Sequence, residues 1–234
     1  MDSKHLERRV LLALLAATRN PSSDIDQLQA DLGVAEGLLN AYVRQLSSEG
    51  LIDRVRNSIV ASHAQRMRIA VKAVALGGDM ESVSKSLEWS EFEDFVSHAF
   101  TENGYRVSHH FRFSSDQRRW EIDLLAIKNP FLIIAECKHW LRGLGVTGAE
   151  KIARDHLART EAFSEALLSL TARVGLKGWT QAILAPVLIS LTHNRNRFYL
   201  NVPVVPVLQL PSFLADLPAY SSQVAHIRVR LAAS

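Results

Sequence analysis

The sequence contains a single cysteine, no apolar run long enough to span a membrane, and no strong excess of either charge. One cysteine excludes an intramolecular disulfide and suits a reducing compartment. The apolar stretch from Val10 to Ala17 is short, and no convincing cleavage site follows it, so we expect neither a signal peptide nor a membrane span. These features predict a cytoplasmic protein with no membrane partner.

The net charge of the chain is too small to identify a class of binding partner. The chain has 234 residues, a formal net charge of +3 and a pI near 9.2. A mildly basic balance permits nucleic-acid binding without demonstrating it. The hydrophobic fraction of 47% is that of an ordinary globular protein, and the length allows one large domain or a medium and a small one.

The first 62 residues show the pattern of a small helical domain that ends in a β-hairpin. Apolar residues recur at helical spacing, and Gly33 stands at a corner between two expected helices. The expected elements are helices over 4–18, 25–32 and 35–50, followed by a hairpin over 50–60. In this order they resemble a winged-helix domain over residues 1–62.

The winged-helix resemblance leaves two kinds of partner open. The candidate recognition helix, 35–48, carries a single arginine, Arg44. Residues 1–62 contain seven Lys or Arg and eight Asp or Glu, so 7 − 8 = −1, a poor charge for an affinity that depends on counterion release. The domain is therefore either a DNA-binding module that uses Arg44 or a module for protein binding or dimerisation.

The rest of the chain has the pattern of an α/β domain behind a helical linker. The linker is expected over residues 63–88, broken at Gly77 and Gly78. After it the pattern predicts a helix over 89–100, strands over 105–113, 121–127 and 131–138, a helix over 147–174, strands over 181–191 and 202–210, and a short helix over 211–217. Hairpin strands followed by a crossover helix and more strands predict a mixed sheet flanked by helices over residues 89–234.

Two of these strands carry charged residues where a buried strand should have none. Asp123 lies in the first apolar run, and Glu136 and Lys138 lie at the end of the next. Because side chains at i and i+2 of a strand share a face, Glu136 and Lys138 project together, with Cys137 on the opposite face. Carboxylates and an ammonium gathered on an apolar sheet are costly to desolvate unless they bind something, and a hard divalent cation is the best candidate.

These residues also match a known pattern. The order of motifs resembles the PD-(D/E)xK nuclease superfamily, and within it the Mrr-type restriction endonucleases and archaeal Holliday junction resolvases. The resemblance rests on Glu93 in a helix, Gly104-Tyr105-x-Val107, Glu121-x-Asp123 and Glu136-x-Lys138. Ile122 stands where the family name has a proline. The resemblance implies a restriction-endonuclease-like fold and a nuclease activity.

The expected chemistry is metal-assisted hydrolysis of a phosphodiester. Asp123 and Glu136 are the predicted ligands of Mg²⁺, for which Mn²⁺ can substitute, with the backbone carbonyl of Cys137 as a third. Lys138 is predicted to orient or deprotonate water, or to neutralise developing charge. The resemblance implies that Glu93 contributes to the metal site directly or through water, with Glu91 as the alternative.

Several basic residues are weaker candidates for nucleic-acid contacts. Arg118 and Arg119 precede the strand of Asp123, Arg112 lies on the strand before it, and His139 directly follows Lys138. Each is equally well explained as a solvated side chain. The same two interpretations apply to Arg44 of the first domain.

The sequence thus predicts a Mg²⁺-dependent endonuclease that acts on DNA. A homodimer is expected, because cutting two strands usually requires two active sites. The alternative is a winged-helix DNA-binding regulator whose nuclease-like domain has lost its catalytic function.

Overall fold

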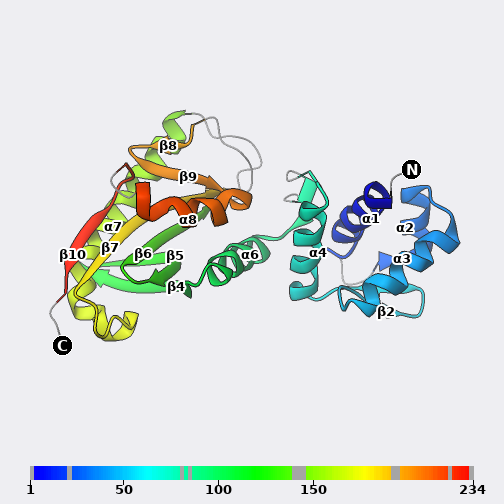
Figure 1. Ribbon diagram of the computed structural model, residues 1–234, viewed down its shortest axis with the longest axis horizontal. Helices are drawn as coiled ribbons and strands as arrows, with labels where there is room; N and C mark the ends of the chain where they lie inside the picture. Colours follow the sequence, from blue (N-terminus) through cyan, green and yellow to red (C-terminus); the bar gives the residue numbers. More distant parts are fainter. Residues whose placement is uncertain are drawn as a thin grey trace. The chain divides into compact units, whose positions relative to one another are not determined.

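The computed structural model describes residues 3–19, 23–79, 82–83, 86–138, 146–190, 196–220 and 223–231 (Figure 1). Its contacts divide the chain into two compact units, Met1–Asp94 and Phe95–Ser234. Among the described residues, no helix is both long enough and apolar enough to cross a membrane.

The first unit contains the helices and the hairpin expected near the N-terminus. Its elements are α1 (Ser3–Ala17), α2 (Ile25–Leu32), α3 (Glu36–Ser48), α4 (His63–Ala75) and a three-stranded sheet in the order β1 (Ser23–Asp24), β3 (Ser58–Val60), β2 (Asp53–Val55). Asp24 begins α2 by accepting hydrogen bonds from the N–H groups of Asp26 and Gln27. Gly33, with φ of 62°, ends α2 in the left-handed conformation that glycine tolerates.

The core of this unit continues into the segment expected to be a linker. Ser62 and Gln65 form a capping box that starts α4. Ile69 and Ala73 of α4 are buried in the same cluster as the apolar residues of α1. Residues 63–88 are therefore not a bare connection, because much of this segment packs into the first core.

The second unit is built on a seven-stranded sheet preceded by α6 (Trp89–Glu102), which begins in the first unit and continues into the second. The strand order is β4-β5-β6-β7-β9-β8, and β10 pairs with β7; the strands are β4 (Arg106–Ser115), β5 (Arg118–Lys128), β6 (Phe131–Lys138), β7 (Gln181–Ser190), β8 (Phe198–Tyr199), β9 (Val202–Pro206) and β10 (Ile227–Arg230). The pairs β6–β7 and β7–β9 are parallel, and the others are antiparallel. The predicted α/β class with a mixed sheet flanked by helices is confirmed.

The structure differs from the predicted elements in several places, including the short strands β1 and β8, which were not predicted. The strand expected over 202–210 ends at Pro206, which has no N–H to donate to a ladder, and a 3₁₀ turn and α8 (Leu210–Tyr220) follow. The strand β10 was not predicted. Its inward and outward residues alternate, but it is only four residues long and depends on pairing with β7.

Two helices cover the sheet on opposite faces (Figure 1). The long helix α7 (Val146–Val174) packs Phe163 and Leu167 onto residues of β4 to β7 and β10. On the strands near the far edge, Tyr199 and Val202 pack against α7, whereas Phe198, Pro203 and Val205 face α8. The alternation of side chains along these strands therefore separates an α7 face from an α8 face.

Candidate functional site

The two predicted metal ligands lie at one level of the sheet. The antiparallel β5–β6 ladder pairs Leu124 with Ala135, so the next step along both strands brings Asp123 opposite Glu136. There, Asp123 Oδ2 accepts a hydrogen bond from the backbone N–H of Cys137 at 3.0 Å. The fold thus brings these two residues to opposite positions on neighbouring strands and fixes one oxygen of Asp123.

The sheet is irregular at Asp123. The β4–β5 ladder pairs His109 with Leu124 and Phe111 with Ile122, but skips His110 and Asp123 between them. His110 has a φ of 47°, in the left-handed region that a bulky residue rarely adopts. The core-facing residues of β5 change from Trp120 and Ile122 to Leu125 and Ile127 across this point. Local backbone strain of this kind is concentrated at functional sites in proteins.

Glu136 is a buried carboxylate that is shared by two cations. Lys138 Nζ lies 2.6 Å from Glu136 Oε1, which confirms that these two side chains project together. Arg159 of α7, which was not predicted, forms an ion pair with Glu136 Oε2. Burial lowers the pKa of Arg159, while the charges of Asp123 and Glu121 act in the opposite direction. Glu136 itself is only 6% exposed, whereas the Lys138 side chain remains partly open to solvent.

A buried histidine completes the cluster. His156 Nε2 lies 2.8 Å from the backbone oxygen of Ile134, and since a carbonyl can only accept, this nitrogen carries the proton. The other ring nitrogen, Nδ1, then holds a lone pair, lies 3.9 Å from Glu136 Oε2, and has no hydrogen-bond partner among the described residues. Burial lowers the pKa of His156 to about 4, so the ring is neutral at neutral pH.

The contribution of α7 to this site was missed by sequence reasoning. His156 occupies a position in the buried stripe of α7, whose members recur every three or four residues; the stripe contains Ala149, Ala153, His156, Thr160, Phe163 and Leu167. Arg159 follows His156 by three residues and projects from nearly the same side. A histidine within an otherwise apolar or small-residue stripe was the available signal.

The donors present suit a hard divalent cation. The described part of the chain has no group of three or more His, Cys, Asp or Glu side chains placed to hold a metal ion. Two carboxylates at one level are nevertheless sufficient for Mg²⁺, which keeps several waters and takes phosphate oxygens as further ligands. The orphaned Nδ1 of His156 beside Glu136 indicates that the cluster lacks one partner. The role of the Cys137 carbonyl remains a prediction.

The two helix acids predicted as alternatives for this site belong to the first unit. Glu91 is buried at 1% exposure and lies 2.6 Å from Arg66 Nε, which makes it part of a structural ion pair. Glu93 is 5% exposed and accepts a hydrogen bond from Trp89 Nε1 at 2.8 Å. A catalytic role for Glu93 remains a prediction.

The predicted arginines lie around the start of β5. Arg112 Nε donates to Glu121 Oε2 at 2.6 Å, which lowers the pKa of Glu121 and raises that of Arg112. The guanidinium of Arg118 lies 3.8 Å from the ring centre of Trp120. A groove of 360 Å³ between β5 and α7 is lined by Arg118, Arg119, Trp120, Glu121, Asp155, Ala158 and Arg159. This groove connects the exposed arginines with Arg159, the residue that reaches Glu136.

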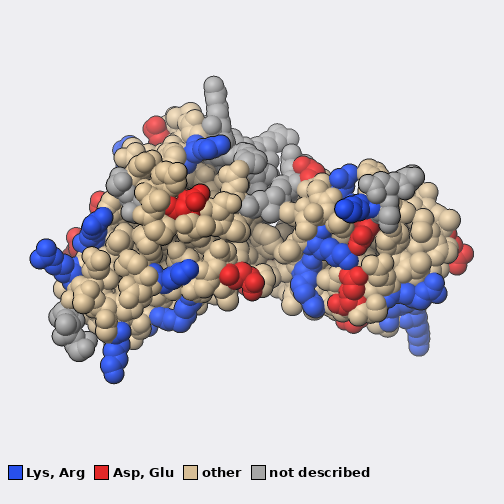
Figure 2. Space-filling model, in the orientation of Figure 1, with Lys and Arg blue, Asp and Glu red and all other residues tan. Residues whose placement is uncertain are grey.

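The remaining candidates lie in the first unit or outside the described residues. Arg44 lies on the exposed side of α3 in the first unit. His139 lies outside the described residues. On the face shown in Figure 2, basic and acidic side chains are interspersed on both units.

Comparisons with known proteins point to nuclease-related domains. Residues 88–182 match the family model described as NERD, nuclease-related domain, and this segment includes β4, β5, β6 and α7. These residues are therefore similar to a nuclease-related domain. No match is found among curated proteins.

Three solved structures are similar to the chain at low identity. They are protein VC1899 from Vibrio cholerae (16% identity, 94% of this chain and 55% of that chain, TM-score 0.39), restriction endonuclease FokI (12%, 92%, 44%, 0.36) and FokI bound to DNA (13%, 91%, 44%, 0.38). The chain spans about half the length of these proteins.

Proposed function

We propose that this protein is a metal-dependent endonuclease of the Mrr-like type that hydrolyses DNA phosphodiester bonds, preceded by a winged-helix domain. The observation that carries the proposal is the cluster of Asp123, Glu136 and Lys138 at one level of the sheet, within the segment similar to a nuclease-related domain. A homodimer is part of the proposal, because two such sites would cut both strands of a duplex.

The residues of the cluster take separate roles in this proposal. Asp123 and Glu136 hold Mg²⁺, or Mn²⁺ in its place; when bound, the metal polarises the phosphate and supplies an activated water. Lys138, partly exposed at 2.6 Å from Glu136, can turn its ammonium toward the phosphate or the attacking water. The hydrogen bond from the Cys137 N–H keeps Asp123 in position as the other groups move.

The groove beside the cluster suits the backbone of a nucleic acid. Arg118, Arg119 and Arg159 line it, and Arg112 lies on the neighbouring strand. Guanidinium groups bind phosphates with two parallel hydrogen bonds, so the three that line the groove support a salt-dependent grip on the strand.

The test is cleavage of plasmid, branched and methylated DNA by the wild type and by Asp123→Asn, with Mg²⁺, Mn²⁺ or EDTA. We expect wild-type cleavage that requires the metal and is lost in Asp123→Asn. Asp155→Asn is the matched control, because Asp155 is an exposed acid that lines the same groove. If wild type and Asp123→Asn behave alike on every substrate, the nuclease proposal fails. Metal-independent duplex binding without cleavage would favour the regulator instead.

A further inference from the structure

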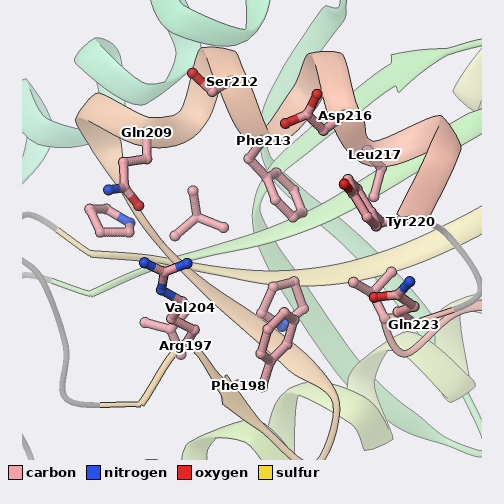
Figure 3. Close-up of a pocket in the computed structure, with 14 residues that line it drawn as sticks. Arg197, Phe198, Val204, Gln209, Ser212, Phe213, Asp216, Leu217, Tyr220 and Gln223 are labelled. Carbon is pink, nitrogen blue, oxygen red and sulfur yellow. The ribbon is translucent and has the colours of Figure 1, made fainter.

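The second unit has a cavity that the proposed reaction does not use. It measures 510 Å³ and lies between α8 and the strands β8 and β9 (Figure 3). Phe213, Leu217 and Tyr220 approach it from α8, and Phe198 approaches from the strand side. The volume falls within the range of about 300–1,000 Å³ that is usual for small-ligand sites.

This cavity is separate from the carboxylate cluster. Most of its walls come from α8 and from strand residues on the α8 face, such as Phe198 and Val205, whereas His156 and Arg159 meet Glu136 from α7 on the opposite face. Along the sheet, Glu136 pairs with Leu188 and Leu188 pairs with Val204, so β9, which contributes to the cavity, is two strands away from Glu136. An occupant of the cavity is therefore not the reacting group.

Its aromatic side chains are unusually open to solvent. Phe198 is 49% exposed and Tyr220 is 52% exposed, although both have an apolar wall beside them. Large apolar side chains gathered around a hollow usually mark a binding surface. Rings on opposite sides of a cavity provide flat surfaces for a flat ligand.

The rim adds polar groups of both kinds. Gln209 and Gln223 carry amides that donate and accept, Ser212 a hydroxyl that does both, Arg197 donors and Asp216 acceptors. None of these five side chains has a hydrogen-bond or ion-pair partner within the part of the chain that the structure describes. The single positive and single negative charge cancel, so the cavity does not select a strongly charged ligand.

We propose that this cavity binds a nucleobase, stacked on the aromatic side chains and read at its edge by the rim amides. A nucleobase is flat, carries no net charge, and presents donors and acceptors along one edge, which matches the three properties of the cavity. An apolar surface of a second copy matches less well, because it would leave the five polar rim groups without partners. The base comes either from a polynucleotide or from a free nucleotide.

The experiment uses the full chain in EDTA, to suppress the proposed metal-dependent cleavage, and two fluorescent probes. One is a short oligothymidylate with a single central 2-aminopurine, and the other is 2-aminopurine riboside monophosphate. We expect quenching of the probe on binding, and a loss of affinity of about fivefold or more in Phe198→Ala, as found when a stacking partner is removed. Quenching of both probes identifies free nucleotides as ligands, and quenching of the oligonucleotide alone identifies a base within a strand; both outcomes support the cavity.

Three further variants test whether binding of the probes depends on this cavity. Leu200→Ala removes an apolar side chain of similar exposure, 45%, that does not line the cavity, and it should bind as the wild type does. Gln209→Ala should weaken binding without removing a ring. Asp123→Asn should bind both probes normally, so a failure of the proposed cleavage leaves this test intact.

Three results would overturn the proposal. The first is equal affinity in Phe198→Ala, Gln209→Ala and wild type. The second is equal competition by an unlabelled strand of the same length in which every residue is abasic. The third is a Phe198→Ala variant whose oligomeric state in sedimentation differs from that of the wild type while its affinity for the probes is unchanged. That result would assign the cavity to contacts between copies of the chain.

Discussion

Each unit buries a glutamate beside an arginine, yet the two pairs are completed differently. In the first unit, Glu91 accepts from Arg66 and from the N–H of Glu88. Arg66 also donates to the backbone oxygens of Leu15 and Ser86 and to Thr18 Oγ1, so protein atoms satisfy the whole cluster. In the second unit, Glu136 meets both Lys138 and Arg159, and the neighbouring His156 Nδ1 has no partner among the described residues.

This difference distinguishes a structural ion pair at Glu91 from a candidate functional site at Glu136. A buried charge is tolerated when surrounding groups satisfy it, as they do around Glu91. Around Glu136 a buried nitrogen has no hydrogen-bond partner among the described residues and two cations remain partly exposed, which is the arrangement that the proposed metal site would use. Four variants can break or sharpen this contrast.

The largest expected effect is on the stability of the first unit. Arg66→Ala leaves Glu91 buried without its cation, which costs about 3–5 kcal/mol in the free energy of unfolding. Urea unfolding measures the cost. Arg68→Ala is the control, because Arg68 lies on the same helix but is exposed and makes one hydrogen bond to a backbone oxygen. Equal losses of unfolding free energy in the two variants would mean that the buried pair of Arg66 and Glu91 stabilises the fold no more than an exposed arginine does.

The corresponding change in the second unit should act on function instead. Glu136→Gln is expected to lower the cleavage rate by about 10²–10³-fold, the usual result of losing one electrostatic stabiliser of the reaction. Its unfolding free energy should fall much less than that of Arg66→Ala, because Lys138 and Arg159 reach solvent. Cleavage rates and urea unfolding of the same preparations test both parts.

Glu165→Gln is the control for this prediction, because Glu165 is an exposed acid of α7 that does not line the groove. A Glu136→Gln variant that cleaves normally but unfolds as easily as Arg66→Ala would show that Glu136 stabilises the fold and is not needed for cleavage.

The part of the site that local sequence can predict is the part built by neighbouring residues. Glu136 and Lys138 share a face because strand side chains alternate, and Asp123 lies opposite Glu136 because a short turn joins their strands. His156 and Arg159 lie about twenty residues further along, on a helix whose rotation over the sheet is set by tertiary packing. The strand β10 could not be predicted from local sequence for the same reason, because it depends on pairing with β7, which is distant in the sequence.

His156 provides the next test, with a smaller effect. His156→Leu removes the unpaired nitrogen and is expected to weaken Mn²⁺ binding by about 10–100-fold, as found for residues that support metal ligands. Calorimetric titration measures this without substrate, after circular dichroism confirms the fold. His109→Leu is the control, because His109 is exposed on β4. Unchanged Mn²⁺ affinity in a folded His156→Leu would reduce His156 to a packing residue.

The smallest effect is expected at the partly exposed ion pairs of Lys72, which lie outside both buried clusters. Lys72 Nζ lies 2.6 Å from Glu49 Oε2 and 3.0 Å from Glu7 Oε1. The hydrogen bond from Lys72 lowers the pKa of Glu49 below its usual value of 4.5, so the pair stabilises the fold above that pH and loses its effect as the pH falls through the lower folded pKa. Because solvent screens the pair, Lys72→Met should cost less than about 1 kcal/mol at neutral pH, and the difference from wild type should shrink in acid. Urea unfolding at pH values above and below 4.5 checks this, and a difference that does not change with pH would assign the effect to packing of the lysine stem rather than to its charge.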